Sequence, residues 1–325
     1  MKKILAFFLM TALLSCSNED QTIQSAEGLS ANSLSVLDGT TLSFKDDKSF
    51  ITEYNELTKL KTGEELQAWI SKKKHSSLLN AINESVIDQE ETLEDTEVSK
   101  YIYSNALSAI FNEDSKVKIN GKTLWLNEQN LYELSSVDLN KTSEQLQVER
   151  SNLKIYGNVF GETKNNETGR SIINANKSKS WEYGFNWDGR ERKIILTLFN
   201  ETIYLNGDVY TTKMFLRAQR LGRYCSVWRC RWNSDAGGVV MVRFTGYTNW
   251  PINPIFVEYY SYQLNDNANT IMLADGSRYS GTPVMLPGPA DYFAVSGTVT
   301  CSFTNVPAIQ FQPAATTWTQ DISWF

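Results

Sequence analysis

The second half of the chain alternates between turn dipeptides and short runs that favour β-strands. Such runs, rich in Val, Ile, Thr, Tyr, Phe and Trp and separated by tight turns, are typical of antiparallel β-structure. The turn dipeptides are Asp188-Gly189, Asn206-Gly207, Gly237-Gly238, Asp275-Gly276 and Pro287-Gly288. The clearest strand-like runs are 192–199, 209–216, 226–233, 239–247, 256–263 and 294–303. Six or more strands joined in this way predict an all-β antiparallel sandwich over residues 181–325.

The first half shows helical spacing and then a hairpin signal. Apolar residues recur every three or four positions after residues 47–49, which predicts a first helix. A second helix is predicted to begin at Thr62, which forms a capping box with Glu65, and a third to cover residues 95–112. Asn120-Gly121 between two apolar runs predicts a type I′ hairpin. We therefore expect an α+β chain, with a small helical and hairpin region over residues 42–162, a linker over 163–180 and then the sandwich.

Composition changes at the same place as the predicted architecture. Residues 1–180 hold 18 Lys and 2 Arg against 26 Asp and Glu, so this part carries the whole net charge of −6. Aromatic residues number 13 in that part and 26 after it. The acidic balance argues against a nucleic-acid partner, which would require a basic face. An aromatic-rich sandwich makes the second part the better candidate for binding.

The N-terminus has the features of a secretory signal peptide. Two lysines precede an apolar run that is too short to span a membrane, and residues 1–15 are predicted to be removed. The sequence Leu13-Leu14-Ser15-Cys16 resembles the lipobox of bacterial lipoproteins, which implies lipidation of Cys16. Residues 16–41 are predicted to be a flexible tether. We therefore expect a lipid anchor in the outer membrane, with the folded part at the cell surface.

A resemblance supports this expected location. The motifs Phe44-Lys45-Asp46, Asn55-Glu56-Leu57 and 109–114, together with Trp69, are similar to the N-terminal region of Bacteroidota cell-surface lipoproteins. Most members of that group have no known function. The resemblance covers roughly residues 43–135, implies a surface lipoprotein and carries over no catalytic residue.

Three cysteines remain once Cys16 is lipidated. Strand alternation through residues 224–232 places Cys225 and Cys230 on opposite faces of one continuous strand, where they could not bond. Cys230 and Cys301 both point inward by pattern, so they are either an inter-sheet disulfide or two buried thiols. The cysteine spacing does not suggest a zinc site, and we expect no metal or cofactor.

The chain has a single histidine, which limits acid–base chemistry. His75 follows three lysines at the end of a predicted helix, and we expect it at the surface. Histidine-dependent catalysis is therefore not expected in the aromatic part. A glycoside hydrolase would need only paired carboxylates. The candidates for such a pair are Glu182, Glu201, Asp235, Glu258 and Asp291.

One predicted strand face is the best candidate for ligand recognition. Glu258, Tyr260 and Tyr262 share a face by alternation, and Trp250 lies in a nearby predicted loop. Exposed Trp and Tyr can stack on sugars or anchor a protein partner. The arginines at 217, 220, 223, 229 and 231 are either a patch for an anionic partner or, as we favour, a solvated face paired with Asp and Glu.

Together these patterns predict a lipid-anchored surface protein with a binding or adhesion role toward a glycan or protein ligand. Two alternatives stay open: a carbohydrate-active hydrolase that uses Asp and Glu, and a structural envelope lipoprotein without a soluble ligand.

Overall fold

The computed structural model describes most of the chain between Leu34 and Trp324. The described ranges are 34–60, 62–82, 103–159, 163–164, 171–172, 178–187, 189–206, 208–226, 230–234, 239–250, 253–259, 268–275, 294–304 and 316–324. The predicted signal peptide and Cys16 lie outside these ranges, as does most of the predicted linker. The chain from Leu34 to Phe325 forms a single unit by its internal contacts.

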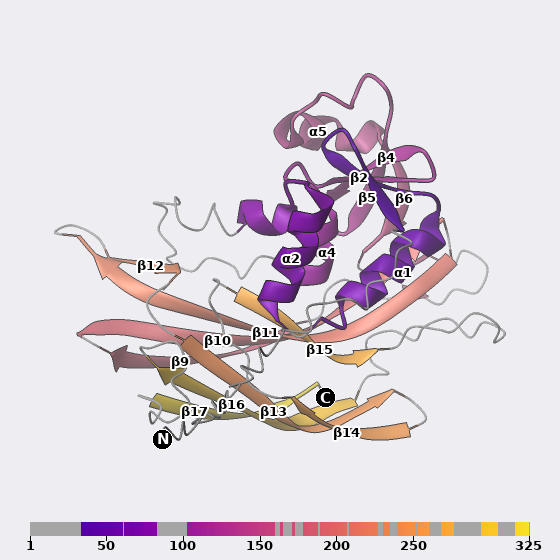
Figure 1. The fold of residues 1–325 in the computed structure, drawn as a ribbon. Coiled ribbons are helices and arrows are strands. Elements are labelled where there is room, and N and C mark those ends of the chain that lie inside the picture. Colours follow the sequence, from indigo (N-terminus) through magenta and orange to yellow (C-terminus); the bar gives the residue numbers. More distant parts are fainter. Residues whose placement is uncertain are drawn as a thin grey trace, which may run out of the picture. The chain divides into compact units, whose positions relative to one another are not determined.

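The fold is mostly β, and its largest element is an eleven-stranded mixed sheet (Figure 1). The path of the sheet is β1-β2-β3-β4-β5-β6-β10-β11-β12, with β9 also paired to β10 and β15 to β11. Only the β2–β3 pairing is parallel among its described strands. The bounds are β1 Ser35–Asp38, β2 Thr41–Phe44, β3 Lys116–Ile119, β4 Lys122–Asn127, β5 Asn130–Leu134, β6 Lys154–Asn158, β9 Ser178–Trp187, β10 Arg190–Leu205, β11 Asp208–Cys225, β12 Cys230–Ser234 and β15 Ala268–Asp275.

A second sheet has four antiparallel strands in the order β14-β13-β16-β17. Their bounds are β13 Val239–Trp250, β14 Asn253–Tyr259, β16 Ala294–Thr304 and β17 Thr316–Ser323, and a separate short pair joins β7 Thr163–Lys164 to β8 Ser171–Ile172. Within β16, Val299 and Cys301 are fully buried, as the alternation of that strand predicts. The six strand-like runs of the second half therefore all coincide with strands, at least in part.

The helices begin at side chains that satisfy their first backbone N–H groups. They are α1 Asp47–Leu57, α2 Gly63–Lys73, α4 Asn105–Ile110 and α5 Ser143–Glu149, followed by the 3₁₀ turn η1 Arg150–Asn152. The predicted capping box is present at α2, where Thr62 Oγ1 accepts from Glu65 N and Glu65 accepts from Thr62 N. None of the described helices has the length and apolar character needed to cross a membrane.

Two sequence predictions in this part need correction. The third helix was predicted to run from residue 95, but Ser104 is extended and caps a helix that begins only at Asn105. The tether was predicted to run to residue 41, but β1 pairs with β2 across the turn at Gly39, whose φ is +66°. Asp38-Gly39 is the same kind of turn dipeptide that marks the strands farther along the chain.

The Asn-Gly hairpin of the first half is confirmed. Asn120 and Gly121 have φ values of 53° and 72°, and they connect β3 to β4. Positive φ at both central residues is what a type I′ turn requires. The turn brings Val117 opposite Leu124, and both side chains are fully buried.

The strands of the first half continue directly into those of the second. Strand β6 pairs with β10 through Asn158 opposite Tyr204 and Gly157 opposite Leu205. A Cβ atom at Gly157 would lie 2.2 Å from the carbonyl oxygen of Tyr204, so only glycine allows this close approach. The sheet is therefore continuous between the two regions that the sequence predicted as separate, with the predicted linker lying between β6 and β10 in the chain.

Two large apolar clusters lie on β10 and β11. Phe199, Ile203 and Phe215 are buried in one cluster with side chains of α1, α2 and α4. Leu196, Leu198 and Leu216 are buried in the other with side chains of β13, β16 and β17. Each strand thus alternates between a helix-facing side and a side facing the second sheet, as the period of two requires.

Candidate binding site

The predicted recognition face lies only partly within the described residues. Glu258 belongs to β14, opposite Thr245 of β13, and Trp250 ends β13 opposite Asn253. The structure gives the backbone of these two residues but describes neither side chain. Tyr260 and Tyr262 lie outside the described residues. This face stays a prediction.

Glu201 is the one carboxylate candidate that the structure places in a fully buried cluster. Tyr54 Oη donates to Glu201 Oε1 at 2.6 Å, and Ser104 donates to the same carboxylate through its backbone N at 2.8 Å and its Oγ at 2.7 Å. Lys213 lies opposite Glu201 across β10 and β11 and is also fully buried. Burial raises the pKa of Glu201, while the Tyr54 and Ser104 hydrogen bonds and the charge of Lys213 oppose that rise.

This cluster attaches the helices to the sheet rather than facing a substrate. Tyr54 comes from α1, and Ser104 is the N-cap of α4. We call this part of β10 and β11, around Glu201 and Lys213, the covered end. Glu182 is exposed instead and pairs with Lys193 at 3.1 Å, so it does not converge with Glu201. The candidates Asp235 and Asp291 lie outside the described residues.

His75 is buried, contrary to the prediction that it lies at the surface. It is 7% exposed, its Nε2 lies 2.8 Å from the carbonyl oxygen of Ala109, and its ring meets Trp69 edge to face. Because a carbonyl only accepts, Nε2 carries the proton and donates, and the buried Nδ1 has no partner. Burial holds the pKa of His75 below its usual range, with a smaller contribution from the charge of Lys73.

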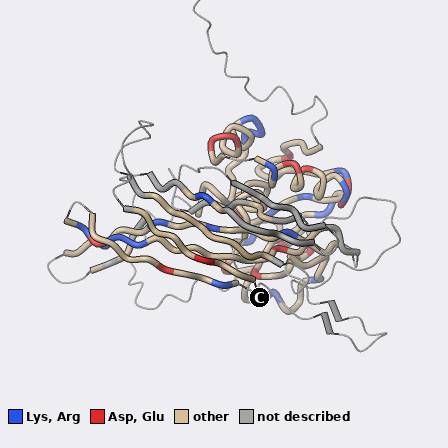
Figure 2. Tube along the Cα trace, turned by 90° about the horizontal axis from the view of Figure 1, so that it is seen from below, with Lys and Arg blue, Asp and Glu red and all other residues tan. Residues whose placement is uncertain are grey.

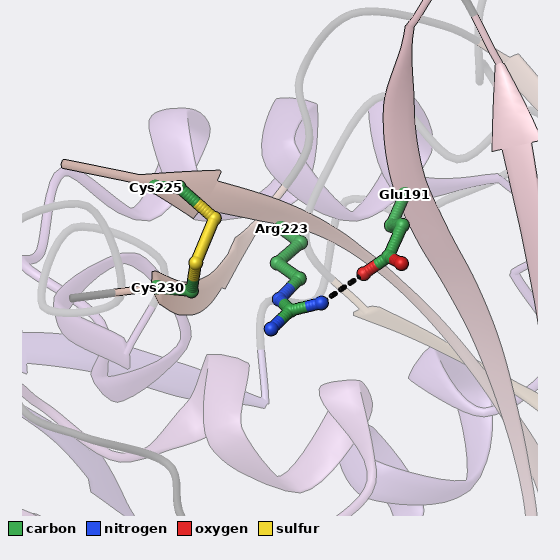
Figure 3. The surroundings of a disulfide bond; sticks show 4 residues. All are labelled: Glu191, Arg223, Cys225 and Cys230. Atoms are coloured by element: carbon green, nitrogen blue, oxygen red, sulfur yellow. Dashed lines mark hydrogen bonds and ion pairs between the residues drawn. A yellow bond between two sulfur atoms is a disulfide. The ribbon is translucent and has the colours of Figure 1, made fainter. Parts of the chain in front are cut away.

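The prediction that Cys225 and Cys230 could not bond is wrong, and Cys230 forms neither of the alternatives left open for it with Cys301. Cys225 is bonded to Cys230, and Cys301 is a buried free thiol, whose pKa burial raises to about 12. The prediction assumed one continuous strand through residues 224–232. The chain instead reverses after Cys225, so β11 and β12 are antiparallel neighbours with the two cysteines directly opposite each other. Because the chain reverses, the two cysteines lie on neighbouring strands instead of on one strand, and their side chains are bonded (Figure 3).

A pocket of about 510 Å³ lies next to this disulfide. It is lined by Gly189, Arg190, Glu191, Arg223, Tyr224 and Cys225. We call this part of β10, β11 and β12 the open end. In Figure 1 it lies away from α1, α2 and α4, at the end of the strands where β12 is labelled. A pocket of this volume is within the range of small-ligand sites.

Charges at the open end are mostly paired across strands. Arg223 forms an ion pair with Glu191, and Figure 3 shows the two side chains pointing toward each other. Lys193 pairs with Glu182, and its Nζ also lies 4.8 Å from the centroid of the Trp232 ring. Figure 2 shows basic and acidic residues mixed along the long strands. For Arg223, this supports the favoured interpretation of the arginine series as a paired strand face.

The rest of that series does not form a single patch. Arg220 is 2% exposed and lies opposite Ile194, on the side of the strand that faces the second sheet. Arg223 lies on the other side and is exposed. The side chains of Arg229 and Arg231 are not described.

Arg190 was not singled out from the sequence. Its guanidinium carbon lies 4.2 Å from the centroid of the Tyr224 ring, a cation–π distance, and both side chains are half-buried. No carboxylate among the described residues pairs with it, in contrast to Arg223. The signal that could have located it is the turn dipeptide at residues 188–189, which brings Arg190 to the end of the sheet.

The described residues contain no group of His, Cys, Asp and Glu side chains arranged to hold a metal ion. No family model, no curated protein and no solved structure matches the chain.

Proposed function

We propose that the chain is a lipid-anchored protein of the outer-membrane surface that binds a ligand through the open end. The observation that carries the binding role is the pocket beside Cys225, with Arg190 stacked on Tyr224. Its guanidinium is oriented by the ring and has no carboxylate partner among the described residues. A charged group that is held in one position within a pocket fixes how a ligand is oriented there and which ligands bind.

The anchor is proposed from the sequence around Cys16 alone. Two or more acyl chains make membrane attachment stable, since each buried CH₂ contributes about 0.8 kcal/mol. Residues 17–34 would then connect the lipid to the first described strand. Cys16→Ala should release the chain from the membrane fraction. Unchanged membrane association of that variant would contradict the anchor.

We further propose that the two sheets form a β-sandwich. Apolar side chains of β10, β11 and β15 share one cluster with those of β13, β16 and β17, as the two inner faces of a sandwich do. The aromatic ring of Tyr183 on β9 also stacks on Trp318 of β17, with ring centroids 5.4 Å apart. The pocket would then lie at one end of the sandwich, on strands fixed by a core.

A glycan array probed with the full chain, alongside a panel of host-cell surface proteins, tests the binding role. We expect a signal that falls in Tyr224→Ala, because loss of the ring releases Arg190. Trp250→Ala provides the comparison with the face predicted from the sequence. Binding that depends on Trp250 but not on Tyr224 would move the site to that face, and no ligand in either assay would favour a structural envelope role.

A further inference from the structure

Arg190 and Tyr224 lie just beyond the last paired residues of the β10–β11 ladder. Arg192 pairs with Gly222, so residues 190 and 224, two positions farther on each strand, lie on the same side of the sheet. Gly222 carries no side chain, and Tyr224 provides the ring that Arg190 contacts. The ring holds the guanidinium in one place and removes part of the entropy that a free arginine would lose on binding.

The Arg223–Glu191 ion pair determines which charge of the pocket is left to contact a ligand. Of the three charged side chains in the lining, Glu191 and Arg223 pair with each other on the opposite side of the sheet, and the charge of Arg190 remains. The described lining thus has one uncompensated positive charge. A guanidinium has five N–H donors in a planar fork, which matches a carboxylate in a bidentate manner.

We propose that this pocket binds a sugar acid, with Arg190 holding the carboxylate of a carboxylated glycan. This inference rests on the proposed binding role of the open end and adds the chemical class of the ligand. The described lining has no aliphatic side chain, and its ionic and hydroxyl groups suit the carboxylate and hydroxyls of a sugar acid. Glu191 and the Tyr224 hydroxyl supply groups for sugar hydroxyls.

Titration calorimetry with matched oligosaccharides tests the ligand class. The full chain in detergent is titrated with oligogalacturonides and with the same oligomers after reduction of their carboxyl groups to alcohols. We expect binding of the acid form only, weakened by salt because a charge pair forms. Arg190→Ala should weaken it about tenfold or more, the usual effect of losing a charge-assisted hydrogen-bonded pair.

Three variants separate a specific carboxylate contact from general attraction. Arg190→Lys keeps the charge but loses the fork, so binding should be intermediate. Glu191→Gln frees Arg223 from its partner, so binding of the acid form should become tighter. Arg150→Ala is the control for loss of a positive charge: Arg150 is exposed, pairs with Glu128 at 3.4 Å and is not in the pocket lining, so its loss should leave binding unchanged.

Several outcomes would overturn the inference. Equal binding of the reduced oligomers would show that the pocket takes a neutral sugar, and binding weakened equally by Arg150→Ala would show non-specific attraction. Tighter binding of a sulfated glycan without carboxylates, or of poly-glutamate, would assign the pocket to a different anion. Each of these results leaves the proposed binding role of the open end intact if Tyr224→Ala abolishes binding. Binding that is unchanged in both the Arg190 and the Tyr224 variants would contradict the binding role of the open end itself.

Discussion

The two ends of β10 and β11 carry similar side chains in opposite surroundings. At the covered end, Glu201 and Lys213 are fully buried, and Tyr54 donates to the carboxylate. At the open end, Glu191 and Arg223 form an exposed pair. Charges that are taken out of water must be paired and hydrogen-bonded, so the first set fixes the helices on the sheet. The second set stays in contact with water, so its separation should cost little.

The largest expected effect comes from removing one carboxylate at each end. Glu201→Ala leaves Tyr54 and Ser104 without their shared acceptor and removes the carboxylate that faces the charge of Lys213. Loss of one partner of a buried charged group costs about 3–5 kcal/mol. Glu191→Ala should cost less than about 1 kcal/mol, because exposed ion pairs contribute little. Urea unfolding of both variants measures the difference in the free energy of unfolding.

The comparison between the ends would fail if the two variants lost similar stability. Glu201→Gln serves as the control for shape, since it retains an acceptor oxygen of nearly the same position. It should fall between the wild type and Glu201→Ala. A Glu201→Ala protein as stable as the wild type would mean that the cluster does not hold the helices.

Whether a residue could be predicted from the sequence depended on how local its determinants are. The capping box of Thr62 and Glu65 and the turn at Asn120-Gly121 each act within four residues, and both were found. Tyr54 and Glu201 are 147 residues apart, and no spacing in the sequence relates them. The burial of His75 likewise depends on Trp69 and on the carbonyl group of Ala109, which come from different helices.

The open end was missed because of one reversal of the chain. Alternation is reliable along a strand, but residues 226–229 contain no Gly, Pro, Asn or Asp to mark a turn. A continuous strand was therefore predicted, and with it the wrong cysteine pair. The arginines were counted as a series along one strand, although the cross-strand partners Glu191 and Tyr224 determine which of them is paired.

A second effect, of intermediate size, is expected from the disulfide at the open end. The bond closes a loop of six residues, for which the chain-entropy relation gives about 2 kcal/mol. Replacing both Cys225 and Cys230 with Ala should lower the free energy of unfolding by up to that amount and weaken ligand binding, because Tyr224 adjoins the bridge. Urea unfolding and calorimetry on the same sample measure both.

The free thiol provides the control for that experiment. Cys301→Ala removes a buried side chain from the apolar cluster that β10 and β11 share with the second sheet. Cys301 is far along the chain from the pocket, so this substitution should change stability but not binding. A double variant that binds as tightly as the wild type would show that the disulfide does not order the pocket. Reduction of the wild type with a dithiol should reproduce the double variant.

The smallest expected effect comes from His75. Its titration tests whether the surroundings of this side chain disfavour an unpaired charge, as those of Glu201 do at the covered end. Its pKa is lowered in the folded chain, so the unfolded chain binds more protons below pH 6.5. Stability should therefore be full above that value and fall as the pH drops below it, by about 1.4 kcal/mol for each unit of lowering. Because the chain has one histidine, a single NMR imidazole signal reports the titration. His75→Gln retains a donor for Ala109 and should lose this part of the acid sensitivity. A midpoint at or above 6.5 would show that burial does not disfavour the imidazolium and would contradict the buried position of His75 against Trp69.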